Sequence, residues 1–95
     1  MTAKLYRYPH PIIPGKWLYV GQGAKRDAAH RAGKTSFGRR FKRLFPGTSL
    51  PKPIRWEEPA KSQAEVNEAE IVSMFRYHSW YGYPGGMNLT LPGSQ

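Results

Sequence analysis

The sequence predicts a small α+β fold in the order β-β-α-β-α, with a three-stranded, mainly antiparallel sheet flanked by helices. Two short strand patterns joined by a Pro- and Gly-rich connection predict an antiparallel hairpin. Two helical patterns, over 37–45 and 63–78, lie on either side of a third strand pattern. A chain of 95 residues has room for one domain with a thin core, so we expect residues 1–95 to form a single domain.

The strands are predicted from alternation and from prolines. Residues 4–8 alternate polar and apolar side chains, which is typical of a strand. Three prolines between Pro9 and Pro14 cannot donate into a ladder, so they predict a connection before a second strand over 16–21. The third strand is expected at 53–57 and at a sheet edge, because it begins with Pro53.

The helices are predicted from their caps and their apolar periodicity. Residues 22–35 are mostly loop, with room for one helical turn at 28–32. Ser36 is the expected N-cap of helix 37–45, whose apolar residues form one stripe: Phe37, Phe41, Leu44 and Phe45. A capping box over 62–65 opens helix 63–78, whose apolar residues surround the wheel and predict a mostly buried helix. The tryptophans are expected to pack the core.

The charge of the chain is +9 and is unevenly placed. Residues 1–56 hold thirteen Lys and Arg against Asp27 alone and carry +12, whereas residues 57–95 carry −3. A domain this basic on one side attracts polyanions through counterion release, which favours a nucleic acid as partner. An anionic membrane is disfavoured, because no long amphipathic helix gathers the cations opposite an apolar face.

Composition also excludes several classes of protein. The chain has no cysteine, which excludes disulfides and thiolate metal sites. No run reaches the roughly 18 apolar residues of a membrane span. The N-terminus lacks the apolar core of a signal peptide, so we expect a cytoplasmic protein, nucleoid-associated or encoded by a phage or mobile element.

The stretch Leu18–Gly23 is the first candidate for a binding role. A strand that ends in Gly21-Gln22-Gly23 before a basic segment can bring backbone N–H groups close to a phosphate. The alternative is an ordinary turn that uses the freedom of glycine.

Four side chains are candidates for phosphodiester chemistry. Tyr6 and Tyr19 can share one face of the hairpin, where nearby cations favour proton transfer from water; cross-strand packing is the alternative. Arg40 can stabilise charge on a phosphate or simply contact the backbone of a nucleic acid. Glu70 lies between apolar residues of its helix and suits a single ligand of Mg²⁺ or Mn²⁺.

Other charged residues compete for these roles. Glu68 is the rival of Glu70, while Glu65 belongs to the capping box. The histidines, His10, His30 and His78, show no metal-ligand spacing, and the sequence argues against a proton-transfer role for His30.

In this order and spacing the motifs resemble the GIY-YIG nuclease superfamily. Leu5-Tyr6 is similar to the end of the GIY element, with Lys4 in place of its glycine, and Tyr19-Val20-Gly21 is similar to the YIG element. The helix segment 38–43 resembles the one that carries the catalytic arginine of the family, with Arg40 as the match. Glu70 followed by Met74 resembles the metal-binding glutamate, and Asn88 in the run 85–88 resembles the closing asparagine.

The resemblance implies a Mg²⁺-dependent endonuclease that acts on double-stranded DNA. Tyr6 or Tyr19 would activate water, Arg40 would stabilise the phosphate, and Glu70 would hold one metal ion. Asn88 would position a phosphate or brace the site. The segment between Tyr19 and Arg40 is longer than in compact homing enzymes, which leaves Arg26 and Arg31 as rival catalytic arginines.

Two alternatives stay open from the sequence. Leu44 stands where the family often has a histidine, so the base must be a tyrosine or His30, or the chain is a non-catalytic nucleic-acid-binding module. That module would be a degenerate nuclease or a basic RNA-binding protein. A purely structural basic protein that does not bind nucleic acid is a third possibility, and the oligomeric state, a homodimer included, stays open. Backbone contacts to DNA are expected from the cations of the basic segment: Lys25, Arg26, Arg31, Lys34, Arg39, Lys42 and Arg43.

Overall fold

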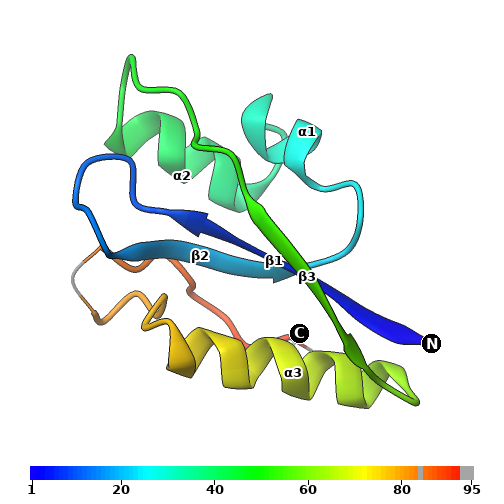
Figure 1. The fold of residues 1–95 in the computed structure, drawn as a ribbon. Coiled ribbons are helices and arrows are strands. Elements are labelled where there is room, and N and C mark those ends of the chain that lie inside the picture. Colours follow the sequence, from blue (N-terminus) through cyan, green and yellow to red (C-terminus); the bar gives the residue numbers. More distant parts are fainter. Residues whose placement is uncertain (84, 93–95) are drawn as a thin grey trace.

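Three layers make up the fold in the computed structural model, which describes residues 1–83 and 85–92. Strands β1 (Thr2–Pro9), β2 (Trp17–Gln22) and β3 (Ile54–Pro59) form one antiparallel sheet in the order β2-β1-β3. Helices α1 (Asp27–Arg31) and α2 (Ser36–Leu44) cover one face, and α3 (Gln63–Arg76) covers the other (Figure 1). The predicted α+β class, the β-β-α-β-α order and the edge position of β3 are confirmed.

Each face of the sheet has its own small core. Tyr6, Tyr8 and Leu18 pack with Phe37 and Phe41 of α2. The second core lies between the sheet and α3. It contains Ala3 and Leu5 of β1, Val66 of α3, and Ala60 from the segment that joins β3 to α3. Because neither core is large, the sheet needs both helical layers to exclude water from its two faces.

Three local predictions differ from the structure. Thr35, not Ser36, is the N-cap of α2, since the Thr35 hydroxyl accepts a hydrogen bond from the backbone N–H of Gly38 at 3.0 Å. Residues 27–31 form the helix α1, where mostly loop was expected. Leu44, placed in the apolar stripe of α2, is exposed.

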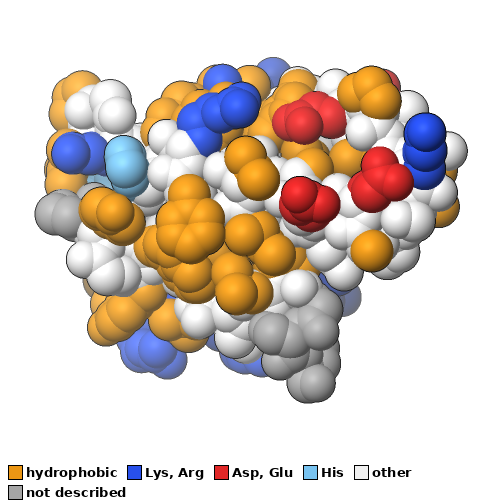
Figure 2. Space-filling model, turned by 90° about the horizontal axis from the view of Figure 1, so that it is seen from below, with side chains coloured by type: hydrophobic (Ala, Val, Ile, Leu, Met, Phe, Trp, Pro, Cys, Tyr) orange, Lys and Arg blue, Asp and Glu red, His pale blue; other side chains and the backbone are white. Residues whose placement is uncertain are grey.

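Helix α3 is also less buried than its wheel predicted. Val66, Glu70 and Met74 face the sheet, but Val72 and Phe75 are about half exposed, because only one side of the helix meets the sheet. Figure 2 views the molecule from this side and shows apolar side chains in a broad patch with acidic ones beside it. The helix also ends at Arg76, two residues before the predicted end.

The glycine run after β2 does not form a phosphate-binding loop. Gly21 lies within β2, where it pairs with Tyr6. The N–H of Gly23 donates to the carbonyl oxygen of Lys4 at 2.8 Å, so it extends the pairing with β1 and is not free for an anion. The run is not a turn either, because Gly21 and Gln22 belong to the strand and only Gly23, with φ of +116°, uses the freedom of glycine.

Candidate active site

A cavity of about 310 Å³ lies beside β2, between α2, α3 and residues 88–92. We call it the tyrosine cavity. Its lining includes every side chain that the sequence proposed for catalysis: Tyr6, Tyr19, Arg40, Glu70 and Asn88. They come from two strands, two helices and the C-terminal segment, so only the tertiary fold brings them together.

The hairpin register places the two tyrosines on the same face of the sheet. Tyr6 pairs with Gly21 and Tyr8 pairs with Tyr19. A Cβ atom at Gly21 would overlap the Tyr6 ring and hydroxyl, so glycine is required for the Tyr6 ring to cross β2 toward the cavity. Tyr19 stacks on Phe37, with ring centroids 4.0 Å apart. Burial raises the pKa of both phenols, which are therefore neutral at rest.

His30 joins the site through Tyr6. The Tyr6 hydroxyl lies 2.8 Å from His30 Nε2, and His30 Nδ1 lies 2.6 Å from the hydroxyl of Thr35. Burial, helped by the nearby Arg26, lowers the pKa of His30 to about 4, so the imidazole is neutral at pH 7. A neutral imidazole with Nε2 unprotonated accepts from Tyr6 and donates from Nδ1 to Thr35. The sequence argued against His30, and the structure places it in contact with the first candidate base.

The position of His30 depends on how α1 packs against α2. A Cβ atom at Gly38 would overlap the carbonyl oxygen of His30, so glycine lets the two helices approach. The Thr35 hydroxyl that hydrogen-bonds to His30 Nδ1 also caps α2. Thr35 and Gly38 could therefore have indicated the position of His30, but only if residues 27–31 were already known to form a helix.

Arg40 reaches the cavity from α2. One terminal nitrogen, Nη1, donates to the carbonyl oxygen of Met87 at 3.0 Å, which anchors the guanidinium to the C-terminal segment. Its Nε is buried and has no hydrogen-bond partner among the described residues. Burial lowers the pKa of Arg40, and Arg43 adds to this shift by repulsion. A guanidinium held in this position can bind an anion without rearrangement.

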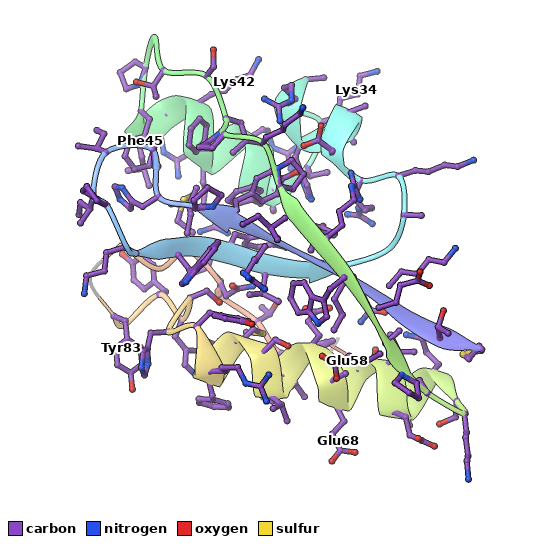
Figure 3. The ribbon with its side chains drawn as sticks, in the orientation of Figure 1. Lys34, Lys42, Phe45, Glu58, Glu68 and Tyr83 are labelled. Carbon is purple, nitrogen blue, oxygen red and sulfur yellow. The ribbon has the colours of Figure 1, made fainter. Side chains whose placement is uncertain are left out.

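Glu70 supplies the only carboxylate of the described cavity lining. It is 8% exposed, and burial raises its pKa despite the opposing effects of Gln22 and Arg26. Glu68, the rival, is exposed and points away from the sheet (Figure 3). Glu65 lies in the first turn of α3, where its N–H donates to Ser62.

Asn88 braces the site rather than facing it with a free amide. Its Nδ2 donates to the carbonyl oxygen of Val20, and its Oδ1 accepts from the N–H of Val20, both at 2.9 Å. The side chain thus pairs with the outer edge of β2 as a neighbouring strand would. Of the two predicted roles, bracing is the one that its contacts show.

The predicted basic residues divide between the cavity and other surfaces. Arg26 lines the tyrosine cavity, whereas Arg31 is paired with Asp27 at 3.0 Å and donates to backbone carbonyls of residues 50 and 51. Arg31 therefore does not line the tyrosine cavity, whereas Arg26 does. Lys42 borders a separate cavity together with Arg31. The remaining predicted cations are exposed: Lys25, Lys34, Arg39 and Arg43.

No protein-family model, curated protein or solved structure matches the chain. The resemblance to GIY-YIG nucleases therefore rests on sequence motifs alone.

The described residues contain neither a membrane-spanning helix nor a cluster of metal-ligating side chains. In residues 1–83 and 85–92 no helix has both the length and the apolar character to cross a membrane. The same residues contain no group of three or more His, Cys, Asp or Glu side chains that could hold a metal ion.

Proposed function

We propose that the chain is a metal-dependent endonuclease that hydrolyses phosphodiester bonds of double-stranded DNA. The observation that carries the proposal is the convergence of Tyr6, Tyr19, Arg40 and Glu70 on one cavity. Two phenols, a fixed guanidinium and a buried carboxylate are the groups that water activation, phosphate stabilisation and metal binding require.

Tyr6 acts as the base in this proposal, with His30 as the acceptor behind it. A neutral phenol can take a proton from water only if it passes its own proton on, and His30 Nε2 is 2.8 Å away. As the water oxygen attacks phosphorus, its proton moves to Tyr6 and the Tyr6 proton moves to His30. The bond from phosphorus to the 3′ oxygen breaks, and the 3′ oxygen takes a proton from solvent water, which leaves a 5′-phosphate and a 3′-hydroxyl. An imidazole with a pKa of about 4 then releases the proton readily.

Arg40 binds the phosphate in the transition state. Its anchored Nη1 fixes the guanidinium, and its remaining N–H groups can meet the charge that develops on phosphate oxygens. Arg26, on the same cavity, provides a second cation.

Glu70 fits the requirements of a single ligand for Mg²⁺ or Mn²⁺. Its carboxylate is buried at the cavity wall and has no salt bridge to any described residue. A hard cation that keeps most of its waters needs only one such carboxylate. When bound, the metal would supply charge stabilisation for the leaving 3′ oxygen.

Plasmid nicking tests the proposal with a matched pair of arginines. Arg40 lines the cavity and Arg39, its neighbour on α2, is exposed. We expect Mg²⁺-dependent nicking to fall by about 10²-fold or more in Arg40→Ala and to stay near wild type in Arg39→Ala. Equal, trace-level nicking by the wild type and both variants, together with retained DNA binding, would favour the non-catalytic nucleic-acid-binding module instead.

A further inference from the structure

A second pocket, of about 260 Å³, lies at the end of the molecule where the β1–β2 connection meets the C-terminal end of α3. We call it the end pocket. Figure 3 labels Tyr83, one of its lining residues, at this end of the molecule. Its lining shares no residue with the tyrosine cavity. It combines basic and aromatic side chains: Lys16, Arg76, His78, Trp17, Tyr77 and Tyr83.

The aromatic walls of the end pocket are fixed from behind by Arg7. The Arg7 guanidinium lies 4.5 Å from the centroid of the Trp17 ring and 4.3 Å from that of Tyr77. Arg7 Nη1 also donates to the Tyr77 hydroxyl at 3.1 Å. These contacts hold two flat apolar surfaces in place before any ligand arrives, which lowers the entropic cost of binding.

The cations of the end pocket are not neutralised within the described part of the chain. Lys16 and Arg76 are exposed and make no ion pair there, and no lining residue is acidic. The pocket thus offers rings for stacking beside two free positive charges.

His78 is a second and independent sign that the end pocket is used. It has φ of +53°, the only positive φ of a non-glycine residue in the described chain. It occupies the position just after the C-cap of α3, where Ser79 N–H bonds back to Met74 and where glycine is strongly preferred. Keeping a side chain there costs about 1 kcal/mol or more. The His78 ring lies 4.7 Å from that of Tyr83 and lines the pocket.

We propose that the end pocket binds one unpaired nucleotide, with its base on the rings of Trp17, Tyr77 or Tyr83 and its phosphate between Lys16 and Arg76. Stacking on aromatic rings accepts any base, because every base has a flat π-face. A volume of 260 Å³ suits a single base rather than a longer ligand. The nucleotide can be free or can be the end of a strand, since both present a base and a phosphate.

Titration with dAMP, deoxyadenosine and inorganic phosphate, followed by tryptophan fluorescence, separates the two parts of the ligand. We expect dAMP to bind at least about tenfold more tightly than either part alone, because the rings and the cations both contribute. Phosphate that binds as tightly as dAMP would overturn the assignment, since the rings would then contribute nothing.

Paired variants locate the binding. Lys16→Ala/Arg76→Ala should weaken dAMP binding by about tenfold or more, whereas Lys52→Ala/Lys61→Ala, two exposed cations elsewhere, should leave it unchanged. Equal behaviour of the two double variants would refute the site. A short oligothymidylate serves as a further arm: a matching loss in the first variant points to a strand end, and a loss for dAMP alone points to a free nucleotide.

His78→Gly adds a test that misfolding cannot imitate. The substitution should raise the melting temperature, because glycine relieves the positive φ, while it weakens dAMP binding. A variant that gains stability and keeps full binding would remove His78 from the proposal. Plasmid nicking is a separate readout, so the end pocket and the nuclease proposal can fail independently.

Discussion

Each face of the sheet holds an arginine whose buried Nε has no hydrogen-bond partner among the described residues, and the surroundings of the two arginines differ. Arg7, on the α3 face, is enclosed by the rings of Trp17, Trp56 and Tyr77 at 4.3–5.0 Å. Arg40, from α2 above the opposite face, has one backbone anchor and an open cavity in front of it. Enclosure by rings stabilises a cation within the fold, whereas an open guanidinium is available to a ligand. The comparison separates a structural cation from a candidate catalytic one.

The ionisable groups around the tyrosine cavity also have shifted pKa values. Around the tyrosine cavity, burial raises the pKa of Tyr6, Tyr19 and Glu70 and lowers that of His30. Burial disfavours the charged form of each of these groups, so none of them ionises as readily as it would in water. Their concentration at one cavity is therefore typical of a functional site.

The largest effect is expected for Tyr6→Phe, which removes the hydroxyl between the cavity and His30. We expect nicking by the folded variant to fall by about 10³-fold. Tyr8→Phe is the matched control on the same strand and face, because the Tyr8 hydroxyl donates to Asp27 at 2.6 Å and does not line the cavity. The control should lose stability and retain nicking; equal activity losses would contradict the role of Tyr6.

His30→Gln should lower nicking by about 10²-fold, because an amide can hydrogen-bond to Tyr6 but cannot take its proton. The variant should also change the pH dependence of stability. The native pKa of His30 is about 4 and the unfolded value 6.5, so its contribution is present above pH 6.5 and is lost as the pH falls toward 4.

Denaturant unfolding across this pH range measures that contribution. The wild-type chain should lose up to roughly 3 kcal/mol from this group between the two pH values, a loss that His30→Gln lacks. Parallel curves for the two proteins would show that His30 is not buried in the neutral form.

Arg7→Ala should act on stability and not on the chemistry. It leaves a gap among three rings and removes the donor to Tyr77, which costs about 2–3 kcal/mol of unfolding free energy. Lys4→Ala, an exposed residue of the same strand, is the control. If folded Arg7→Ala lost nicking while it kept its stability, the contrast between the two arginines would be reversed.

The smallest effect is a gain in stability for Glu70→Gln. Because burial raises the native pKa of Glu70, the ionised carboxylate costs stability as the pH rises through that pKa, and the cost is absent when the group is protonated. In thermal unfolding the variant should match wild type at acidic pH, where the carboxyl is protonated in both states, and should exceed it at higher pH, where the carboxyl is ionised. A constant difference across this range would mean that the carboxylate is not destabilised by burial.

Local patterns predicted much of the fold, and tertiary contacts account for what they missed. Alternation over 4–8, Pro53 and the cap at Ser62 depend only on neighbouring residues, and the hairpin, the edge strand and the start of α3 follow from them. The apolar pattern of α3 could not show that Val72 and Phe75 are exposed, because their exposure depends on whether another layer of the fold packs on the outer side of the helix.

The main residues of the candidate site could also be predicted from local motifs, but their contacts could not. Tyr6, Tyr19, Arg40 and Glu70 stand at positions that motif order alone indicates, and the fold brings them to one cavity. His30 was named only as an alternative base, and its contact with Tyr6 could not be predicted because it comes from the packing of α1 on Gly38, which no local spacing reveals. Asn88 was found, but its pairing with Val20 requires knowledge of the sheet edge.

Nicking of supercoiled plasmid by Glu70→Gln in Mg²⁺ at neutral pH tests the central claim most directly. The substitution keeps the shape of the side chain and is expected to stabilise the fold, so lost activity cannot be attributed to unfolding. The account predicts a fall of about 10²-fold or more, because an amide is a much weaker ligand for a hard cation. Nicking at the wild-type rate would contradict it.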